Sequence, residues 1–287
     1  MADLAVLKKK ADDLRNSGRE EEAVKAYKQL IDLYTKAGDL KMAGWAQQMI
    51  GVSYKIGNHL DKAIPWYQRA IRSFKKIDDP WGVGNTLRDI GTTYAYRHRY
   101  KEAVTYFRQS ATILKKATDN PAYLGITLVK LALAEMHIGR FTTAHKHFHE
   151  GLALIKKQGH WFFESTAHGN LAEYYVAVGQ YDQALEHLEE GKRIAEAHLD
   201  EELHTRRLSQ YYGLAAFCLV KMGKVPEAKR YFKKAEALLK EFPIDVREPV
   251  EEDIHYEPRV PVRGVVRHPV EDHADAARVG VRENALQ

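Results

Sequence analysis

The sequence predicts an all-α protein: a right-handed solenoid of six helical hairpins followed by a poorly ordered C-terminal tail. Three observations predict this fold: a phrase that recurs about every 40 residues, apolar residues at helical spacing within each copy, and a turn residue in the middle of each copy. The phrase is a small residue, a glycine or other turn residue seven positions later, and an alanine five positions after that. These alanines are Ala23, Ala63, Ala103, Ala144, Ala184 and Ala228.

Each repeat is expected to form a first helix, a tight turn and a second helix. In the second repeat Ile50 and Tyr54 precede Gly57-Asn58, and Ala63 and Tyr67 follow at helical spacing. Small residues on both helices let them approach closely, and a large residue four positions after the alanine fills the remaining gap. Because one hairpin cannot bury its apolar stripe alone, neighbouring hairpins must stack. The repeats span about residues 2–38, 39–78, 79–118, 119–158, 159–199 and 200–242.

A change in composition separates this repeat domain, residues 1–242, from the segment 243–287. The segment holds five of the nine prolines, six arginines and no lysine, and ten acidic residues. Its Pro243 should end the last helix, and its acidic, aperiodic sequence is typical of a disordered tail. Three roles stay open: the tail could cap the last helix, compete with a ligand, or contact nothing.

Two copies of the phrase resemble tetratricopeptide repeats (TPRs): IGVSYKIGNHLDKAIPWY and IGTTYAYRHRYKEAVTYF. The resemblance covers about residues 2–241. The period is longer than the usual period of about 34 residues, as in kinesin light chains, G-protein-modulator scaffolds and many bacterial regulators, and the phrase GNTLRDIG is typical of that long-repeat branch. His98 and Asn58 stand where most copies have glycine. Asparagine adopts the left-handed conformation easily, whereas histidine tolerates it less well.

The resemblance implies that a ligand lies along the concave face built by the first helices. In that family the side chains six and three positions before the small residue, and one, four and five after it, point there. Repeats one to three then supply basic and amide groups, and Arg88 could grip a carboxylate with two hydrogen bonds. Repeat four supplies apolar groups, although Ile126 and Val129 could equally pack between adjacent helices. The candidate ligand-binding residues are Trp45, Gln48, Lys55, Asn85, Arg88, Thr92, Tyr96, Leu133, Met136, His137 and Glu173.

These residues predict a non-enzymatic protein- or peptide-binding scaffold whose partner carries an acidic portion and an apolar anchor. An alternative is a peptide-responsive regulator of a signalling enzyme or of the transcription machinery. RNA binding is a further alternative, because lysine pairs recur at residues 75–76, 115–116 and 156–157, but cations at helix C-termini explain those pairs without a ligand. The sequence contains no phosphate loop, GxGxxG or GxSxG motif, so neither an enzyme nor a cofactor is expected.

No metal site is predicted either. His145 and His149 stand four apart and could share one helical face, but no third ligand follows at a fixed spacing, so a solvated surface is the favoured interpretation. The single cysteine excludes a disulfide framework. The N-terminus has no signal-peptide pattern, and the longest apolar run, residues 211–220, is too short to cross a membrane. A cytoplasmic protein is therefore expected.

Overall fold

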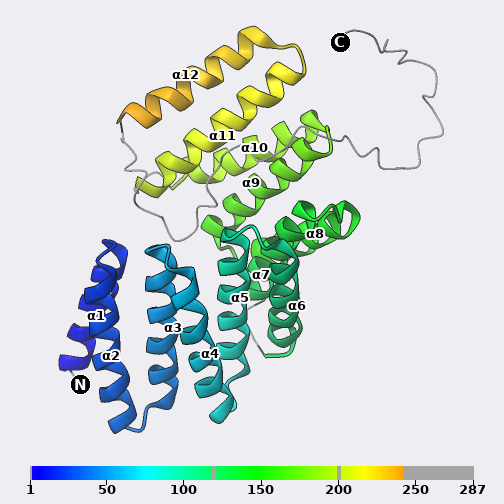
Figure 1. Ribbon diagram of the computed structural model, residues 1–287. Helices are drawn as coiled ribbons and strands as arrows, with labels where there is room; N and C mark the ends of the chain where they lie inside the picture. Colours follow the sequence, from blue (N-terminus) through cyan, green and yellow to red (C-terminus); the bar gives the residue numbers. More distant parts are fainter. Residues whose placement is uncertain (1, 118–120, 199–201, 242–287) are drawn as a thin grey trace, which may run out of the picture. The chain divides into compact units, whose positions relative to one another are not determined.

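The computed structural model describes residues 2–117, 121–198 and 202–241, and all of them lie within one compact unit. The described residues form twelve α-helices and no strand, so the all-α prediction is confirmed (Figure 1). The helices are α1 (Ala2–Asn16), α2 (Glu20–Lys36), α3 (Leu40–Ile56), α4 (Leu60–Lys76), α5 (Pro80–Tyr96), α6 (Tyr100–Ala117), α7 (Ala122–His137), α8 (Phe141–Lys157), α9 (Trp161–Ala177), α10 (Tyr181–Glu196), α11 (Glu202–Lys221) and α12 (Val225–Glu241). The predicted tail, residues 243–287, lies outside the described residues, and so do its three possible roles.

The helices pack in chain order. Each odd-numbered helix pairs with the even-numbered helix that follows it, and each even-numbered helix then contacts the first helix of the next hairpin. Odd-numbered helices also contact one another from α3 to α11. The odd-numbered helices therefore share one continuous face, which is the surface that the candidate residues occupy.

Tight packing inside the hairpins confirms the phase of the repeat. The repeat alanines are buried, and Ala103 has no exposed surface. A Cβ atom added to Gly51 would lie 2.5 Å from the Tyr67 ring, and one added to Gly91 would lie 2.7 Å from the Phe107 ring. A larger residue at either position would therefore force the ring to shift, because the large residue of the second helix rests directly on the first helix.

The last repeat departs from this pattern. The residue four positions after the repeat alanine is buried in the first five repeats, whereas Phe232 is 63% exposed. In the first repeat the corresponding residue, Tyr27, packs edge to face against Trp45 of the next hairpin, with ring centres 5.8 Å apart. Phe232 lacks such cover because no helix follows α12 among the described residues. The expectation that this side chain fills a gap is therefore wrong.

The turns adopt the expected left-handed backbone. Gly18, Gly139 and Gly179 have φ values between 71° and 78°, and Asn58 and His98 have φ values of 59° and 57°. Asparagine and histidine thus occupy the same conformation that glycine adopts elsewhere.

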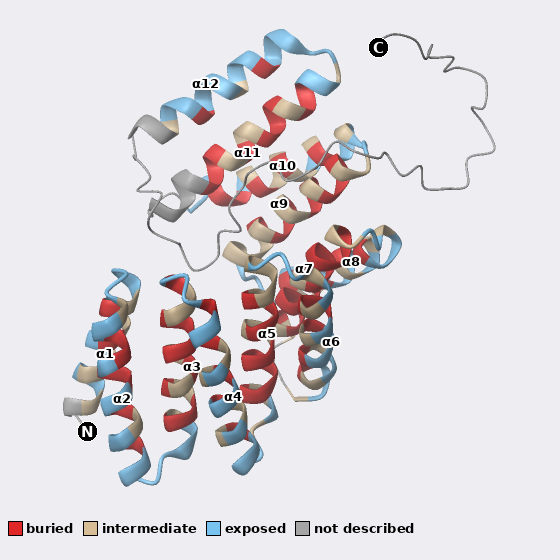
Figure 2. Ribbon diagram, viewed as in Figure 1, coloured by how far each residue is buried: buried red, intermediate tan, exposed pale blue. Residues whose placement is uncertain are grey.

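Burial differs between the two kinds of helix. Figure 2 shows long buried stretches on α5 and α7, whereas α2, α4 and α6 expose much of their length. The even-numbered helices form the solvated side of the array, and the odd-numbered helices form its interior and the candidate ligand face. No helix in the described ranges is both long and apolar enough to cross a membrane.

Candidate functional site

A polar cluster of Gln48, Asn85, Arg88 and Asp89 lies where α3 contacts α5. The Gln48 side-chain nitrogen donates a hydrogen bond to the Asp89 carboxylate at 2.6 Å. The Asn85 side chain is only 3% exposed, and neither its amide nitrogen nor its amide oxygen has a hydrogen-bond partner within the described residues. One guanidinium nitrogen of Arg88, Nη1, is also buried without a partner. Three orphaned polar atoms therefore belong to two candidate residues on one helix.

Local packing fixes the position of Asn85. The Asp79 side chain caps α5 by accepting a hydrogen bond from the Gly82 amide at 3.0 Å, and Pro80 occupies the first turn. At Gly84 an added Cβ would meet Leu114 at 2.7 Å, so α5 lies tightly on α6 at this point. Asn85 and Arg88 are three residues apart and hence share a face of this well-fixed helix.

Orphaned polar atoms are costly. A buried donor or acceptor without a partner costs about 1–3 kcal/mol, and native proteins keep few of them. The side-chain amide of Asn85 offers one acceptor and two donor hydrogens, which match the N–H and C=O groups of an extended peptide backbone. A ligand that supplied both kinds of group would satisfy these atoms.

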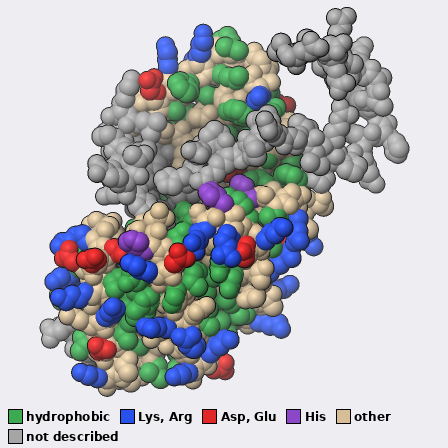
Figure 3. All heavy atoms as spheres, viewed as in Figure 1, with side chains coloured by type: hydrophobic (Ala, Val, Ile, Leu, Met, Phe, Trp, Pro, Cys, Tyr) green, Lys and Arg blue, Asp and Glu red, His purple; other side chains and the backbone are tan. Residues whose placement is uncertain are grey.

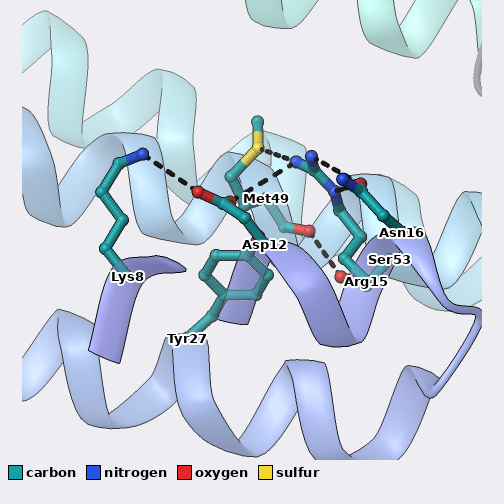
Figure 4. A network of polar contacts seen from close by, with 7 residues as sticks. All are labelled: Lys8, Asp12, Arg15, Asn16, Tyr27, Met49 and Ser53. Carbon is teal, nitrogen blue, oxygen red and sulfur yellow. Dashed lines mark hydrogen bonds and ion pairs between the residues drawn. The ribbon is translucent and has the colours of Figure 1, made fainter. Parts of the chain in front are cut away.

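The first two repeats hold a network whose charges are already paired (Figure 4). Asp12 accepts hydrogen bonds from Lys8 at 3.0 Å and from the Tyr27 hydroxyl at 2.6 Å. The ammonium group of Lys8 also lies 4.5 Å from the centre of the Trp45 ring. Trp45 is thus half-buried between Lys8 and Tyr27, where it offers one edge of an aromatic surface. Lys55, farther along α3, is half-buried and has no ion pair within the described ranges.

The remaining candidates in repeats three and four make contacts within the fold. The Thr92 hydroxyl donates to the Arg88 carbonyl at 2.9 Å, one turn back on the same helix. His137 stacks on Tyr100 with ring centres 4.2 Å apart. Tyr96 is half-buried. Leu133 and Met136 belong to the core shared by α7, α8 and α9 and are 5% and 9% exposed.

A pocket of about 80 Å³ is lined by α7, α8, α9 and α11. Its floor is apolar and includes Ile126 and Val129, whose role the sequence left open. Its polar groups come from one helix face each of α7, α9 and α11: Lys130, Asn170, Glu173, Arg207 and Gln210. Glu173 is the only member of the eleven candidates that lines this pocket.

Two side chains of α11 hold the pocket together. Nη1 of Arg207 donates to the Phe162 carbonyl at 2.9 Å and to the Thr166 hydroxyl. The Tyr211 hydroxyl donates to the Ser165 carbonyl at 2.5 Å. The Tyr211 ring lies against Gly169, where a Cβ atom would come within 2.7 Å. These contacts fix α11 against α9 and keep the pocket narrow.

Glu173 has an unusual environment. Its side chain forms no hydrogen bond or ion pair within the described part of the chain. Burial alone raises the pKa of its carboxyl group to about 7. Near neutral pH this carboxyl is therefore divided between its protonated and ionised forms, and a cationic ligand would favour the ionised form.

The sequence interpretation missed one position in repeats three to five: the residue two before the small residue. Asp89, Lys130 and Asn170 all occupy this position; the first binds Gln48 and the other two line the pocket. The signal was present, because Thr166, Gly169, Asn170 and Glu173 follow the i, i+3, i+4, i+7 spacing of a single helix face.

The histidines form contacts with one another and with the core. The Nε2 atoms of His145 and His149 lie 3.0 Å apart, and both approach the Tyr175 hydroxyl. His147, two residues before His149, lies 2.7 Å from the buried carboxylate of Glu135 and so contacts the core. Among the described residues no three His, Cys, Asp or Glu side chains gather closely enough to hold a metal ion.

Basic side chains are frequent over the N-terminal half of the array. Figure 3 shows Lys and Arg interspersed with apolar groups over the hairpins from α1 to α6. The lysine pairs at 75–76, 115–116 and 156–157 are exposed in the last turns of α4, α6 and α8, where cations stabilise the negative helix end.

Comparisons with known proteins agree with this architecture. A family described as the MalT-like TPR region matches residues 84–255, and the soluble NSF attachment protein family matches residues 8–121. A curated relative, the transcriptional activator NprA of Geobacillus stearothermophilus, is 24% identical over 156 residues, which cover 54% of this chain and 36% of the relative. The chain thus spans about a third of that relative's length.

Solved structures with the same fold have low sequence identity. BtubC (BKLC) from P. vanneervenii superposes with a TM-score of 0.68 at 14% identity and covers 82% of this chain and 94% of its own. Aspartyl phosphate phosphatase F from Bacillus subtilis gives a TM-score of 0.60 at 16% identity, over 77% of this chain and 57% of its own. These likenesses show the fold: the protein is an α-solenoid of TPR type.

Proposed function

The chain belongs to the family of MalT-like TPR regions, and we propose that it is a non-catalytic module that binds an extended peptide segment of a partner protein. The ligand lies along the shared face of the odd-numbered helices. It interacts with the Gln48–Asn85–Arg88–Asp89 cluster at one end of this face and with the α7–α9–α11 pocket farther along.

The observation that carries this proposal is the orphaned amide of Asn85. A globular interior rarely buries a donor and an acceptor on one side chain without partners. A peptide backbone supplies both partners and does not depend on the sequence of the ligand. The buried Nη1 atom of Arg88 lies on the same helix face and would be satisfied by a carbonyl or a carboxylate of the same ligand.

The charged side chains near the cluster favour an acidic peptide. Arg88 and Lys55 supply cations on α5 and α3, whereas Asp89 is hydrogen-bonded to Gln48. We therefore expect the portion of the peptide at α3 and α5 to be acidic. A charge-assisted contact to Arg88 is worth about 1.5–3 kcal/mol, so Arg88→Glu should weaken an acidic peptide by more than about tenfold.

The test selects peptides from a displayed random library against the full chain and measures the best binder by fluorescence anisotropy. Asn85→Leu should lower the affinity of that peptide by about tenfold or more, because two backbone hydrogen bonds of about 1 kcal/mol each are lost. The same substitution should raise the melting temperature of the free protein, because it removes two buried polar atoms that have no partner.

The two expected effects of Asn85→Leu, a lower peptide affinity and a higher melting temperature, distinguish a binding role from a structural role. If Asn85 serves only the fold, Asn85→Leu destabilises the free protein and leaves peptide affinity unchanged, and the proposal fails. Gln68→Leu and Arg72→Glu are matched controls, because both side chains are exposed on α4. Neither control should change the affinity.

The curated relative suggests a second candidate. Because NprA is a transcriptional activator, the array could be the ligand-sensing part of a regulator of transcription. A photo-crosslinking residue at position 88, compared with one at position 72, tests this in cells. Specific crosslinking to a subunit of RNA polymerase or to a DNA-binding protein at position 88 alone supports the second candidate, and crosslinking to other proteins argues against it.

A further inference from the structure

The pocket lined by α7, α9 and α11 combines an apolar floor with a single unpartnered acidic group. Ile126, Val129 and Leu214 contribute to the floor, and Glu173 lies toward the C-terminal end of the α9 face. Ligand pockets for cofactors and drug-sized molecules usually enclose about 300–1,000 Å³. At about 80 Å³, this pocket has room for one side chain rather than for a cofactor.

Two cations line the pocket, Lys130 of α7 and Arg207 of α11, and neither lowers the pKa of Glu173. Arg207 is engaged at the other end, where its Nη1 atom binds the Phe162 carbonyl and the Thr166 hydroxyl and its guanidinium lies 4.3 Å from the Phe162 ring. Thr166 and Glu173 are seven residues apart, which is about 10 Å along a helix. Burial is the only cause that raises the pKa of Glu173, and no nearby cation lowers it.

We propose that the α7–α9–α11 pocket receives a lysine side chain of the bound peptide, with its aliphatic stem on Ile126, Val129 and Leu214 and its ammonium group against Glu173. Lysine fits both features, because its four methylene groups bury well on apolar surface while its head seeks a charged partner. Asn170, one turn before Glu173 on the same face, is placed to bind the adjacent peptide backbone.

This inference rests on the proposed function, and it specifies the partner further. The peptide carries an acidic portion at α3 and α5 and a lysine at α7, α9 and α11. An uncharged apolar side chain would fill the floor but leave the carboxyl of Glu173 without a partner. A second acidic group would add repulsion at Glu173.

The test uses two small probes that differ only in the side-chain head: N-acetyl-lysine N-methylamide and N-acetyl-norleucine N-methylamide. Their affinities for the full chain are measured from methyl NMR shifts of Ile126, Val129 and Leu214. At about pH 8, where Glu173 is ionised, the lysine probe should bind at least about tenfold more tightly, as expected for a charge-assisted contact. At about pH 5.5, where Glu173 is protonated, this preference should largely disappear.

Substitutions test whether Glu173 causes the preference for the lysine probe. Glu173→Gln should abolish the preference for lysine at both pH values, whereas Glu150→Gln, at an exposed position on α8, should preserve it. Equal or tighter binding of the norleucine probe to the wild type at about pH 8 overturns the proposal, and so does failure of both probes to bind. If Glu173→Gln lowers the melting temperature, the test is the pH dependence of the wild type. A preference for the lysine probe that does not decrease between about pH 8 and about pH 5.5 then overturns the proposal.

The two proposals fail separately. Asn85→Leu should leave the probe preference unchanged, because Asn85 does not line this pocket. Library peptides that need Asn85 but not a lysine would remove the lysine proposal and keep the peptide-binding function. If the lysine preference depends on Glu173 but no selected peptide depends on Asn85, the lysine pocket is kept and the peptide-binding function is removed.

Discussion

Removing both hydrogen-bond partners of the buried Glu135 carboxylate should cost the protein about 3–5 kcal/mol of stability, the range measured when a buried charge loses its partner. The Glu135 side chain has no exposed surface, and its two oxygens bind Arg108 of α6 at 2.6 Å and His147 of α8 at 2.7 Å. Glu135 therefore ties three helices together. The double variant Arg108→Ala/His147→Ala, measured by urea denaturation, should show this loss.

A third substitution provides the control. Adding Glu135→Leu to the double variant should recover much of the lost stability, because it removes the unpaired buried carboxylate. A triple variant no more stable than the double variant would contradict this account. Burial raises the pKa of Glu135, but the hydrogen bonds from His147 and Arg108 outweigh it and hold the pKa below its ordinary value. This contribution to stability is therefore present above about pH 4.5 and is lost as the pH falls through the lowered value.

Acidification should destabilise the fold through a second buried group, His168. Burial first, and then the charge of His187, lowers the pKa of His168 from 6.5 to about 4. The Nδ1 atoms of the two rings lie 3.0 Å apart, and Nε2 of His168 is buried without a partner. Between these two pKa values the unfolded chain binds a proton that the folded protein excludes. The free energy of unfolding therefore decreases as the pH is lowered. At about 1.4 kcal/mol per pKa unit, the loss is about 3 kcal/mol.

Urea denaturation between about pH 7.5 and pH 4.5 measures this loss. His168→Asn keeps a side-chain amide that can hydrogen-bond His187 but removes the titrating group, so the stability of this variant should depend much less on pH. His160→Asn, at an exposed position, should keep the wild-type dependence. An unchanged dependence in His168→Asn would contradict the assignment. Other charges act on His168 as well: Glu190 raises its pKa, and Lys156 and Arg193 lower it.

The repeat phase could be predicted from the sequence because it depends on local rules. The alanines and the large residues four positions later recur at helical spacing, and steric contact between paired helices requires small residues where Tyr67 and Phe107 rest. The exposure of Phe232 shows the limit of such rules, because the cover for this position comes from the next repeat, and none follows among the described residues.

The site could be predicted only in part. The resemblance to TPR arrays selected Asn85, Arg88 and Glu173, but their chemistry depends on partners about 40 residues away. Gln48 binds Asp89, and neither Gln48 nor any other described residue satisfies the Asn85 amide. Leu133 and Met136 were selected by position alone, yet packing against neighbouring helices buries them.

A double-mutant cycle between Asn85 and the peptide backbone tests the central claim most directly. A library-selected peptide is made with single amide-to-ester replacements, which remove one backbone N–H donor at a time, and each version is measured against the wild type and Asn85→Leu. If Asn85 binds the backbone, one ester should weaken binding to the wild type by about fivefold to tenfold, the worth of about 1 kcal/mol or slightly more. The same ester should leave binding to Asn85→Leu unchanged. Equal losses for both proteins at every ester position would contradict the claim.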